Sequence, residues 1–341
     1  MIRQWNVAVL GATGLVGDTV IKVLEERKFP VGELFPLASN RSLGKSIEFH
    51  GKSLPVLDIE TFDFSKADIG LFSAGGEVSR IYAPKAAAAG CVVIDNTSEF
   101  RYEHDIPLVI PEVNPGAIAE FRKRRIIANP NCSTIQMLVA LKPIYDAVGI
   151  ERINVATYQS VSGAGKEAVE ELAEQTVALM SGKGPIKPKV VAAQIAFNVV
   201  PQIDKFQDNG YTKEEMKMFW ETRKIFGDAD IRVNATTVRV PVFFGHSEVI
   251  NIETKRKITV PEVRKLLDKA PGVKVIDTRE SGGYPTAAVH AANDDRVFVG
   301  RIREDISHER GLNLWVVSDN IRKGAATNSV QIAEILIREH L

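Results

Sequence analysis

The segment ANPNCSTIQML, residues 128–138, places one of only two cysteines where a helix is expected to begin. Cys132 follows Asn129-Pro130-Asn131 and precedes apolar residues at helical spacing, Ile135, Leu138 and Val139. The N-terminus of a helix stabilises a thiolate and can bind an oxyanion. Cys132 is therefore a candidate nucleophile, although the spacing alone leaves a buried structural cysteine as an equal alternative.

A second candidate site is the glycine-rich stretch GATGLVG (11–17), which lies between a short apolar run and an amphipathic segment. A glycine loop that follows a strand and opens a helix is typical of dinucleotide binding, and a plain tight turn is the alternative. The first glycine permits the turn, and the backbone beyond it can approach a pyrophosphate at the positive end of the helix. The residues expected to do so are Gly11, Thr13, Gly14, Leu15 and Val16.

The end of the next expected strand indicates which dinucleotide is bound. NAD sites place a carboxylate there for the ribose hydroxyls, whereas this chain reads Ala38-Ser39-Asn40-Arg41-Ser42. A guanidinium and hydroxyls can bind a 2′-phosphate, so we expect NADP to be held by Arg41 and Ser42. An arginine in a surface loop is the alternative. A thiolate beside a nicotinamide predicts addition of the thiol to an acyl group, coupled to hydride transfer at the acyl carbon.

Composition excludes several other classes of protein. The 341 residues carry 43 basic and 43 acidic side chains, a balance that argues against a nucleic-acid partner. Two cysteines without a CxxC motif predict neither a disulfide framework nor a metal site. The N-terminus has no signal-peptide cleavage pattern, and no run of eighteen apolar residues is present. We therefore expect a soluble cytoplasmic protein that contacts no membrane.

The elements that must position these residues divide the chain in two. In the first part, strands alternate with helices, which predicts a Rossmann-type, doubly wound parallel sheet over residues 1–132. An amphipathic helix over 321–341 is expected to pack back on this domain and complete it. The strands are expected at residues 6–10, 34–38, 69–73, 91–95, 107–111 and 126–128.

Residues 133–320 show longer strands with an alternating pattern, interrupted by helices rather than regularly interleaved with them. This predicts an α+β second domain with a mixed or antiparallel sheet. Thr212 and Glu215 form a capping box that predicts a helix over 213–226. The strands are expected at residues 154–161, 232–240, 247–255, 296–303 and 312–318.

Several blocks together resemble the bacterial aspartate-semialdehyde dehydrogenases over nearly the whole chain. The blocks occur in the order expected for that family. Glu99 and Tyr102, which flank Arg101, depart from its pattern but leave the phosphate-binding role that it implies for Arg101 intact. The blocks are GATGLVG (11–17), FSAGG (72–76), DNTSEFR (95–101), NPNCSTIQ (129–136), YQSVSGAG (158–165), EEMKMFWETRKI (214–225), RVPVFFGHSE (239–248) and DNIRKGAA (319–326).

The resemblance implies roles for the catalytic residues. Cys132 attacks the β-acyl phosphate of aspartate, and Gln159 orients the thioester. His246 activates Cys132 and later shuttles a proton, because the pKa of histidine ordinarily lies near working pH. Without the surrounding block, a structural histidine with satisfied hydrogen bonds is the alternative for His246.

The resemblance also implies which residues bind the substrate and the nicotinamide. Arg239 shares a strand face with Ala235 and Thr237, and its guanidinium suits a bidentate bond to the substrate α-carboxylate. Arg101 and Lys217 would bind phosphate. Glu214 would meet the substrate amine, and a surface ion pair with Lys217 is the alternative. Ser162, Gly163 and Asn320 would border the cofactor.

The implied enzyme is a homodimer that acts on small molecules. It reduces 4-phospho-L-aspartate with NADPH to L-aspartate 4-semialdehyde and phosphate, through a cysteine thioacyl intermediate. This step belongs to the biosynthesis of lysine by way of diaminopimelate, and of threonine and methionine. Three alternatives stay open: an N-acetyl-gamma-glutamyl-phosphate reductase, a non-catalytic NADP-binding paralogue and a cysteine hydrolase.

Overall fold

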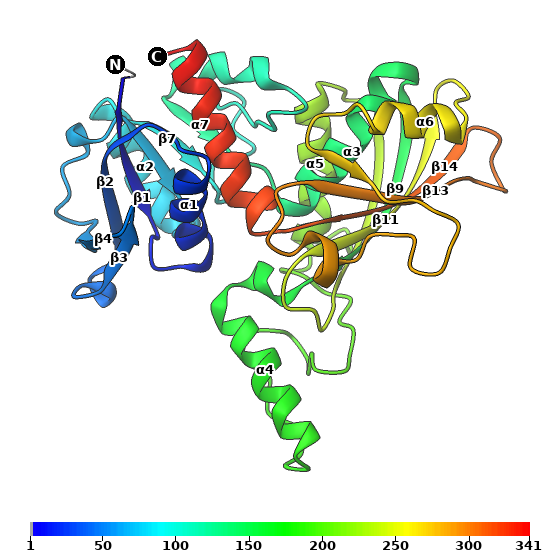
Figure 1. Cartoon of the computed structure of the whole chain (residues 1–341), viewed down its shortest axis with the longest axis horizontal. Coiled ribbons are helices and arrows are strands. Elements are labelled where there is room, and N and C mark those ends of the chain that lie inside the picture. The colour runs from blue at the N-terminus through cyan, green and yellow to red at the C-terminus, as the bar shows by residue number, and fades with distance from the viewer. Residues whose placement is uncertain (1–2) are drawn as a thin grey trace. The chain divides into compact units, whose positions relative to one another are not determined.

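The computed structural model describes residues 3–341, which form two compact units (Figure 1). The first unit comprises the chain up to Asn131 together with Ala325–Leu341, and the second comprises Cys132–Gly324. The change of unit thus falls on the peptide bond before the candidate nucleophile.

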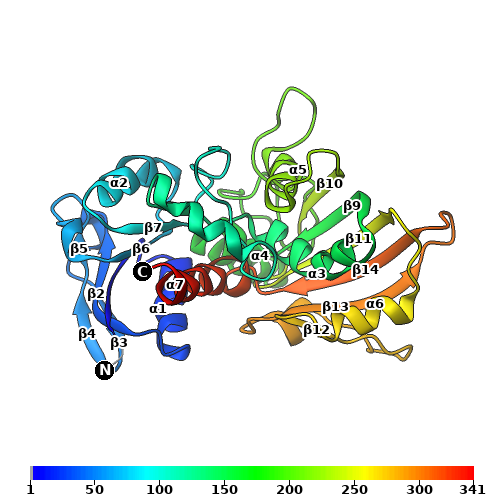
Figure 2. The ribbon, with the colours of Figure 1, turned by 90° about the horizontal axis from the view of Figure 1, so that it is seen from above.

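A six-stranded parallel sheet forms the centre of the first unit, in the order β5-β2-β1-β6-β7-β8. The doubly wound sheet predicted from the sequence is confirmed. Helices α1 and α7 contact each other on one face, and α2 covers the other (Figure 2). The strands are Trp5–Leu10 (β1), Val31–Ala38 (β2), Leu57–Asp58 (β5), Ile69–Phe72 (β6), Val92–Asp95 (β7) and Ile126–Ala128 (β8), and the helices are Leu15–Glu26 (α1), Gly76–Ala88 (α2) and Thr327–Glu339 (α7). A hairpin of Ser46–Phe49 (β3) and Lys52–Pro55 (β4) was not predicted.

Two predictions for the first unit are wrong in detail. Residues 107–111 form no strand, because only Leu108 makes an isolated bridge, to Ala128. The side chain of Asn114 accepts a hydrogen bond from the Ile110 N–H and donates one to the Leu108 carbonyl, so these groups are not available to a neighbouring strand. The last helix begins only at Thr327, after a π-helical turn over Arg322–Ala326.

The second unit is built on a mixed sheet with the order β10-β9-β11-β14-β13-β12, as the sequence predicts. Helix α3 packs on the central strands, and α5 contacts β10, while α4 projects from the sheet with a small apolar cluster of its own (Figure 1). The strands are Ile150–Gln159 (β9), Arg232–Arg239 (β10), His246–Thr254 (β11), Val273–Val275 (β12), Val297–Glu304 (β13) and Gly311–Ser318 (β14), and the helices are Cys132–Val148 (α3), Lys166–Met180 (α4), Lys213–Phe226 (α5) and Val260–Leu267 (α6).

The register of three strands decides which side chains share one edge of this sheet. Strands β9 and β10 run parallel, and their last residues, Gln159 and Arg239, are paired. Strand β11 runs antiparallel to β9, so its first residue, His246, starts at the edge where β9 ends. The predicted capping box is present at α5, where Glu215 also accepts the backbone N–H of Thr237 on β10. The start of α5 is thereby tied to the same strands.

Close packing of α1 on the glycine loop requires glycine at position 17. A Cβ on Gly17 would lie 2.1 Å from the carbonyl oxygen of Gly11. We expect Gly17→Ala to lower the free energy of unfolding by at least roughly 1–3 kcal/mol, measured by urea denaturation. The control Gly116→Ala, where no atom lies within 4 Å of the added carbon, should change it by less than about 0.5 kcal/mol. Equal effects of the two substitutions would contradict this packing.

Candidate active site

Cys132 is the first residue of α3 and is partly exposed, whereas the residues after it in the first turn are buried. Its thiol therefore combines access to solvent with the positive end of a helix of 17 residues. Cys91 differs in both respects. It is fully buried before β7, and burial, followed by the charge of Asp68, raises the pKa of its thiol to about 12.

His246 and Gln159 meet at the sheet edge. The imidazole of His246 is fully buried, and its Nε2 lies 3.4 Å from Nε2 of Gln159. The Gln159 amide also donates to Oε1 of Glu214 at 3.2 Å and accepts from the Thr157 hydroxyl at 3.0 Å. Gln159 is thus held between a carboxylate and the imidazole.

The expectation that His246 titrates near working pH is wrong for this site. Burial lowers the pKa of His246 to about 3, and the neighbouring positive charge of Arg239 contributes to the shift. The negative charge of Glu214 opposes both effects without cancelling them. His246 is therefore a neutral imidazole at pH 7.

Arg239 ends β10 with its guanidinium buried in the same cluster. Its Nη1 donates to the Ser160 carbonyl at 2.7 Å. Burial lowers the pKa of Arg239, while Glu214 and Cys132 raise it; the guanidinium stays protonated. A Cβ on Gly163 would lie 3.0 Å from Nη1 of Arg239 and 3.2 Å from Nε2 of His246. The backbone at Gly163 therefore passes directly against both side chains.

Glu214 and Lys217 form an ion pair on α5, as the alternative interpretation predicted, but the pair is largely buried and does not lie on the surface. The side chains are 6% and 12% exposed, and Nζ of Lys217 lies 2.9 Å from Oε2 of Glu214 and 2.9 Å from Oδ2 of Asp204. Burial alone lowers the pKa of Lys217, but the two carboxylates outweigh it and the pKa is raised. The ammonium is consequently held charged at this position.

Three further polar residues form a hydrogen-bonded cluster next to His246, and they include Ser162 and Asn320, which the resemblance implied. Ser160 contacts Nδ1 of His246 at 3.1 Å and lies within hydrogen-bond distance of both Ser162 and Asn320. The amide of Asn320 donates to the Ser162 hydroxyl at 3.0 Å and accepts from the backbone N–H of Gly245 at 3.0 Å. The third, Ser160, was missed by the sequence analysis. It was detectable only as a small polar residue directly after Gln159.

Gly324 was also missed, and it packs on the candidate nucleophile. A Cβ at this position would lie 2.7 Å from Cβ of Cys132. The N–H of Gly324 bonds to the carbonyl of Asp319 at 3.0 Å, the spacing of the π-helical turn found there. That turn brings an unsubstituted backbone against Cys132.

The glycine loop and the end of β2 lie side by side in the first unit. Gly11 has a φ of +86°, and α1 begins at Leu15, so Thr13 and Gly14 lie in the turn before the helix, and Val16 in its first turn. The hydroxyl of Thr13 lies 3.1 Å from that of Ser42, and the exposed Arg41 shares the short 3-10 turn Asn40–Ser42 with it. The structure therefore brings together the two segments that the sequence assigned to the dinucleotide.

Arg101 is buried in the first unit, in the loop after β7. Its Nη2 donates to the carbonyl of Asn96 at 2.8 Å. Asp95, the residue before Asn96, accepts hydrogen bonds from the hydroxyls of Ser79 and Thr97. Burial raises the pKa of the Asp95 carboxyl, although these hydrogen bonds act to lower it. Hydrogen bonds to Asp95, the last residue of β7, and to the next residue, Asn96, thus fix the loop that contains Arg101.

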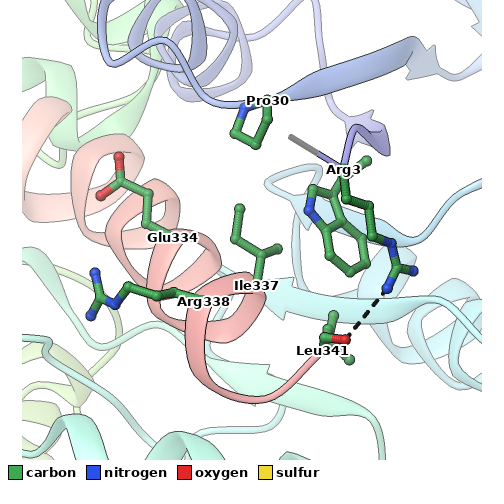
Figure 3. A pocket seen from close by; sticks show the side chains of 7 residues that line it. Arg3, Pro30, Glu334, Ile337, Arg338 and Leu341 are labelled. Carbon is green, nitrogen blue, oxygen red and sulfur yellow. Dashed lines mark hydrogen bonds between the residues drawn. The ribbon is translucent and has the colours of Figure 1, made fainter. Parts of the chain in front are cut away.

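Three further features of the described residues bear on function: metal-binding groups, membrane-spanning helices and cavities. Within residues 3–341, no group of three or more His, Cys, Asp or Glu side chains is arranged to hold a metal ion. In the same range, no helix is long and apolar enough to cross a membrane. A cavity of about 380 Å³ lies between the start of β1 and the end of α7 (Figure 3). It contains none of the expected site residues; its lining is Arg3, Trp5, Pro30, Glu334, Ile337, Arg338 and Leu341.

The two cysteines should differ sharply in reactivity. We expect iodoacetamide at pH 7 to modify Cys132 in the folded protein and to leave Cys91 intact, because Cys91 is buried and its thiol is protonated. Peptide mass spectrometry should find one alkylated cysteine before unfolding and two after it. Alkylation of Cys91 at a comparable rate in the folded protein would contradict this assignment.

Comparison with known proteins gives one consistent answer. Residues 6–121 match the NAD binding domain of semialdehyde dehydrogenases, and residues 141–323 match their dimerisation domain. Aspartate-semialdehyde dehydrogenases from Shewanella sp. (strain DB6705) and Bacillus subtilis are 65% and 50% identical, with full coverage of both chains. The crystal structure of aspartate semialdehyde dehydrogenase II complexed with ASA, from Vibrio cholerae, is 61% identical, with a TM-score of 0.97 over 99% of this chain and 100% of that one. The enzyme from Candida albicans with NADP is 26% identical, with a TM-score of 0.77 over 98% of this chain and 99% of that one. The chain belongs to the aspartate-semialdehyde dehydrogenase family.

Proposed function

We propose that the chain carries out the family reaction through a thioacyl intermediate on Cys132. The reaction is the NADPH-dependent conversion of 4-phospho-L-aspartate to L-aspartate 4-semialdehyde and phosphate. The observation that supports this mechanism is the cluster of polar side chains near Cys132, the first residue of α3. A partly exposed thiol lies within electrostatic reach of Arg239, whose guanidinium shares a buried site with His246 and Glu214.

The first unit fits NADP on structural grounds. The glycine loop leaves no room for a side chain at position 17 and holds Gly11 at a positive φ of +86°, and its turn opens directly into α1, which suits a pyrophosphate. The strand end beside it presents hydroxyls and a guanidinium where an NAD site would present a carboxylate. When bound, the cofactor supplies the hydride. We assign the pyrophosphate to Gly11, Thr13, Gly14, Leu15 and Val16, the 2′-phosphate to Arg41 and Ser42, and the nicotinamide side to Ser162, Gly163 and Asn320.

The charges of the second unit match the polar groups of the substrate. Arg239 has five N–H donors, of which one bonds to Ser160, and we assign the substrate α-carboxylate to this guanidinium. Glu214 receives the α-amine. Lys217 and Arg101 receive the phosphate, and the pairing of Lys217 with two carboxylates keeps its ammonium charged until the substrate arrives.

The chemical steps then follow from the position of Cys132. Its thiolate attacks the acyl carbon, the bond to phosphate breaks, and phosphate leaves. With the cofactor bound, hydride transfer to the thioester would give a tetrahedral oxyanion, and its collapse would release the aldehyde and the thiolate of Cys132. Gln159 and His246 lie where N–H donors can bond to the reacting oxygen, which is the largest contribution that a preorganised site makes to such a step.

The alternatives raised by the sequence receive no support. The Shewanella and Bacillus subtilis relatives are named aspartate-semialdehyde dehydrogenases and are 65% and 50% identical over their full length. A matched dimerisation domain agrees with a homodimer. We propose that the first unit binds NADP and that the second carries catalysis and dimerisation. Because aspartyl phosphate is a reactive acyl phosphate, we also propose that the enzyme works in the cytoplasm, beside the kinase-type reaction that must supply it.

Loss of the nucleophile tests the covalent mechanism. We expect Cys132→Ala to lower kcat by at least about a thousandfold, with the Kd for NADPH unchanged within about twofold, because the thiol acts in chemistry alone. The control Cys91→Ala should keep kcat, although it can cost stability. A Cys132→Ala enzyme with activity within about tenfold of wild type would contradict the mechanism.

The assignment of the 2′-phosphate can be tested at Arg41. Arg41→Ala should lower kcat/KM for NADPH by about ten- to a hundredfold, the value of one charge-assisted hydrogen bond, and leave kcat/KM for NADH almost unchanged. Lys52→Ala removes another exposed cation of the same unit and should affect neither cofactor. Equal losses with both cofactors in Arg41→Ala would refute the assignment.

A further inference from the structure

Gln159 is tied to its own strand by the hydroxyl of a buried threonine two residues earlier. The Thr157 hydroxyl donates to Oε1 of Gln159 at 3.0 Å. Alternate residues of a strand point to the same face, so the two side chains lie next to each other along β9. They are 0% and 1% exposed, so water does not compete for this bond.

The charge of Glu214 decides which end of the Gln159 amide faces Thr157. Oε2 of Glu214 accepts from the ammonium of Lys217 at 2.9 Å, and Oε1 lies 3.2 Å from Nε2 of Gln159. A carboxylate bonded to an ammonium is ionised and can only accept, so the NH2 group of Gln159 must face it. The carbonyl oxygen of Gln159 therefore faces Thr157, and the threonine hydroxyl must be the donor there.

The neighbouring strand β11 presents no strong competitor for the Thr157 hydroxyl. Glu248 is the cross-strand partner of Thr157 and is fully buried. Burial raises the pKa of Glu248 well above its ordinary value, although Gln136 acts to lower it, so the uncharged carboxylic acid is favoured. In the described range 3–341, neither oxygen of Glu248 accepts a hydrogen bond from Thr157. The hydroxyl is thus left to Gln159.

The bond at the NH2 end of Gln159 is the one that the substrate can disturb. We assign the substrate α-amine to Glu214, so an ammonium that arrives there competes with the Gln159 amide for the same carboxylate. The bond from Thr157 comes from the same strand and meets none of the assigned substrate groups. It is the contact that keeps the amide beside His246 while the substrate is bound.

We infer that Thr157 is a positioning residue, which anchors the Gln159 amide for the reaction without touching the substrate. The inference rests on the proposed function and deepens it. Thr157 lies directly before the block YQSVSGAG, so the motif itself gave it no role. Failure of the proposed function is a separate result, namely an active Cys132→Ala enzyme.

The chain offers a matched control for a test of this role. Thr237 is the register neighbour of Thr157 on β10 and is equally buried, but among the described residues its hydroxyl has no hydrogen-bond partner. We expect Thr157→Val to lower kcat by about five- to thirtyfold, the value of one buried hydrogen bond, with KM for aspartyl phosphate within about threefold of wild type. Thr237→Val should change kcat by less than about twofold. Equal effects of the two substitutions on kcat, or a loss confined to KM, would overturn the inference.

Two further variants separate positioning from packing. Thr157→Ser keeps the hydroxyl but fills the site less well than valine, and it should retain kcat within about threefold. In a Gln159→Ala background, Thr157→Val should lower kcat no further, because the partner of the hydroxyl is already absent. A serine variant that loses more activity than the valine variant, or additive losses in the double variant, would show that Thr157 acts through packing alone and would overturn the inference.

Discussion

The register of β9, β10 and β11 is the constraint on which the rest of the candidate site depends. Parallel pairing sets Gln159 beside Arg239 at the end of two strands, and the antiparallel strand β11 starts with His246 at the same edge. A shift of one residue in any of these pairings would turn the side chain to the opposite face of the sheet. The capping box of α5 adds Glu214 to the cluster, because Glu215 is bonded to both Thr212 and Thr237.

Burial then decides what the assembled groups can do. Inside the sheet edge, His246 is neutral, Arg239 stays charged against the cost of burial, and Lys217 is held charged by two carboxylates. Negative charge that develops on a substrate oxygen would therefore meet prearranged donors and cations in a dry environment, where such contacts are strongest. The thiol of Cys132 is partly exposed, unlike the buried His246 and Arg239.

Much of the fold and of the candidate site could be predicted from the sequence, because both depend largely on patterns among residues that are neighbours along the chain. Glycine spacing, the proline before Cys132, strand alternation and the capping box each concern neighbours along the chain, and the resulting sheets agree with them.

The residues that were missed act through contacts between distant segments. Ser160 matters because Asn320 and His246 reach it from 160 and 86 residues away, and Gly324 matters because of its distance to Cys132. The pKa of His246 was misjudged for the same reason, since its burial and its neighbour Arg239 are products of the tertiary fold.

The covalent mechanism requires that the acyl group of aspartate passes through the sulfur of Cys132. The most direct measurement is intact-protein and peptide mass spectrometry after the enzyme is mixed with aspartyl phosphate in the absence of NADPH and quenched in acid. We expect a mass increase of one aspartyl group on the peptide that contains Cys132, and its disappearance when NADPH is added before the quench. An enzyme that turns over fully yet shows no adduct, or that carries the adduct on another residue, would contradict a thioacyl intermediate on Cys132.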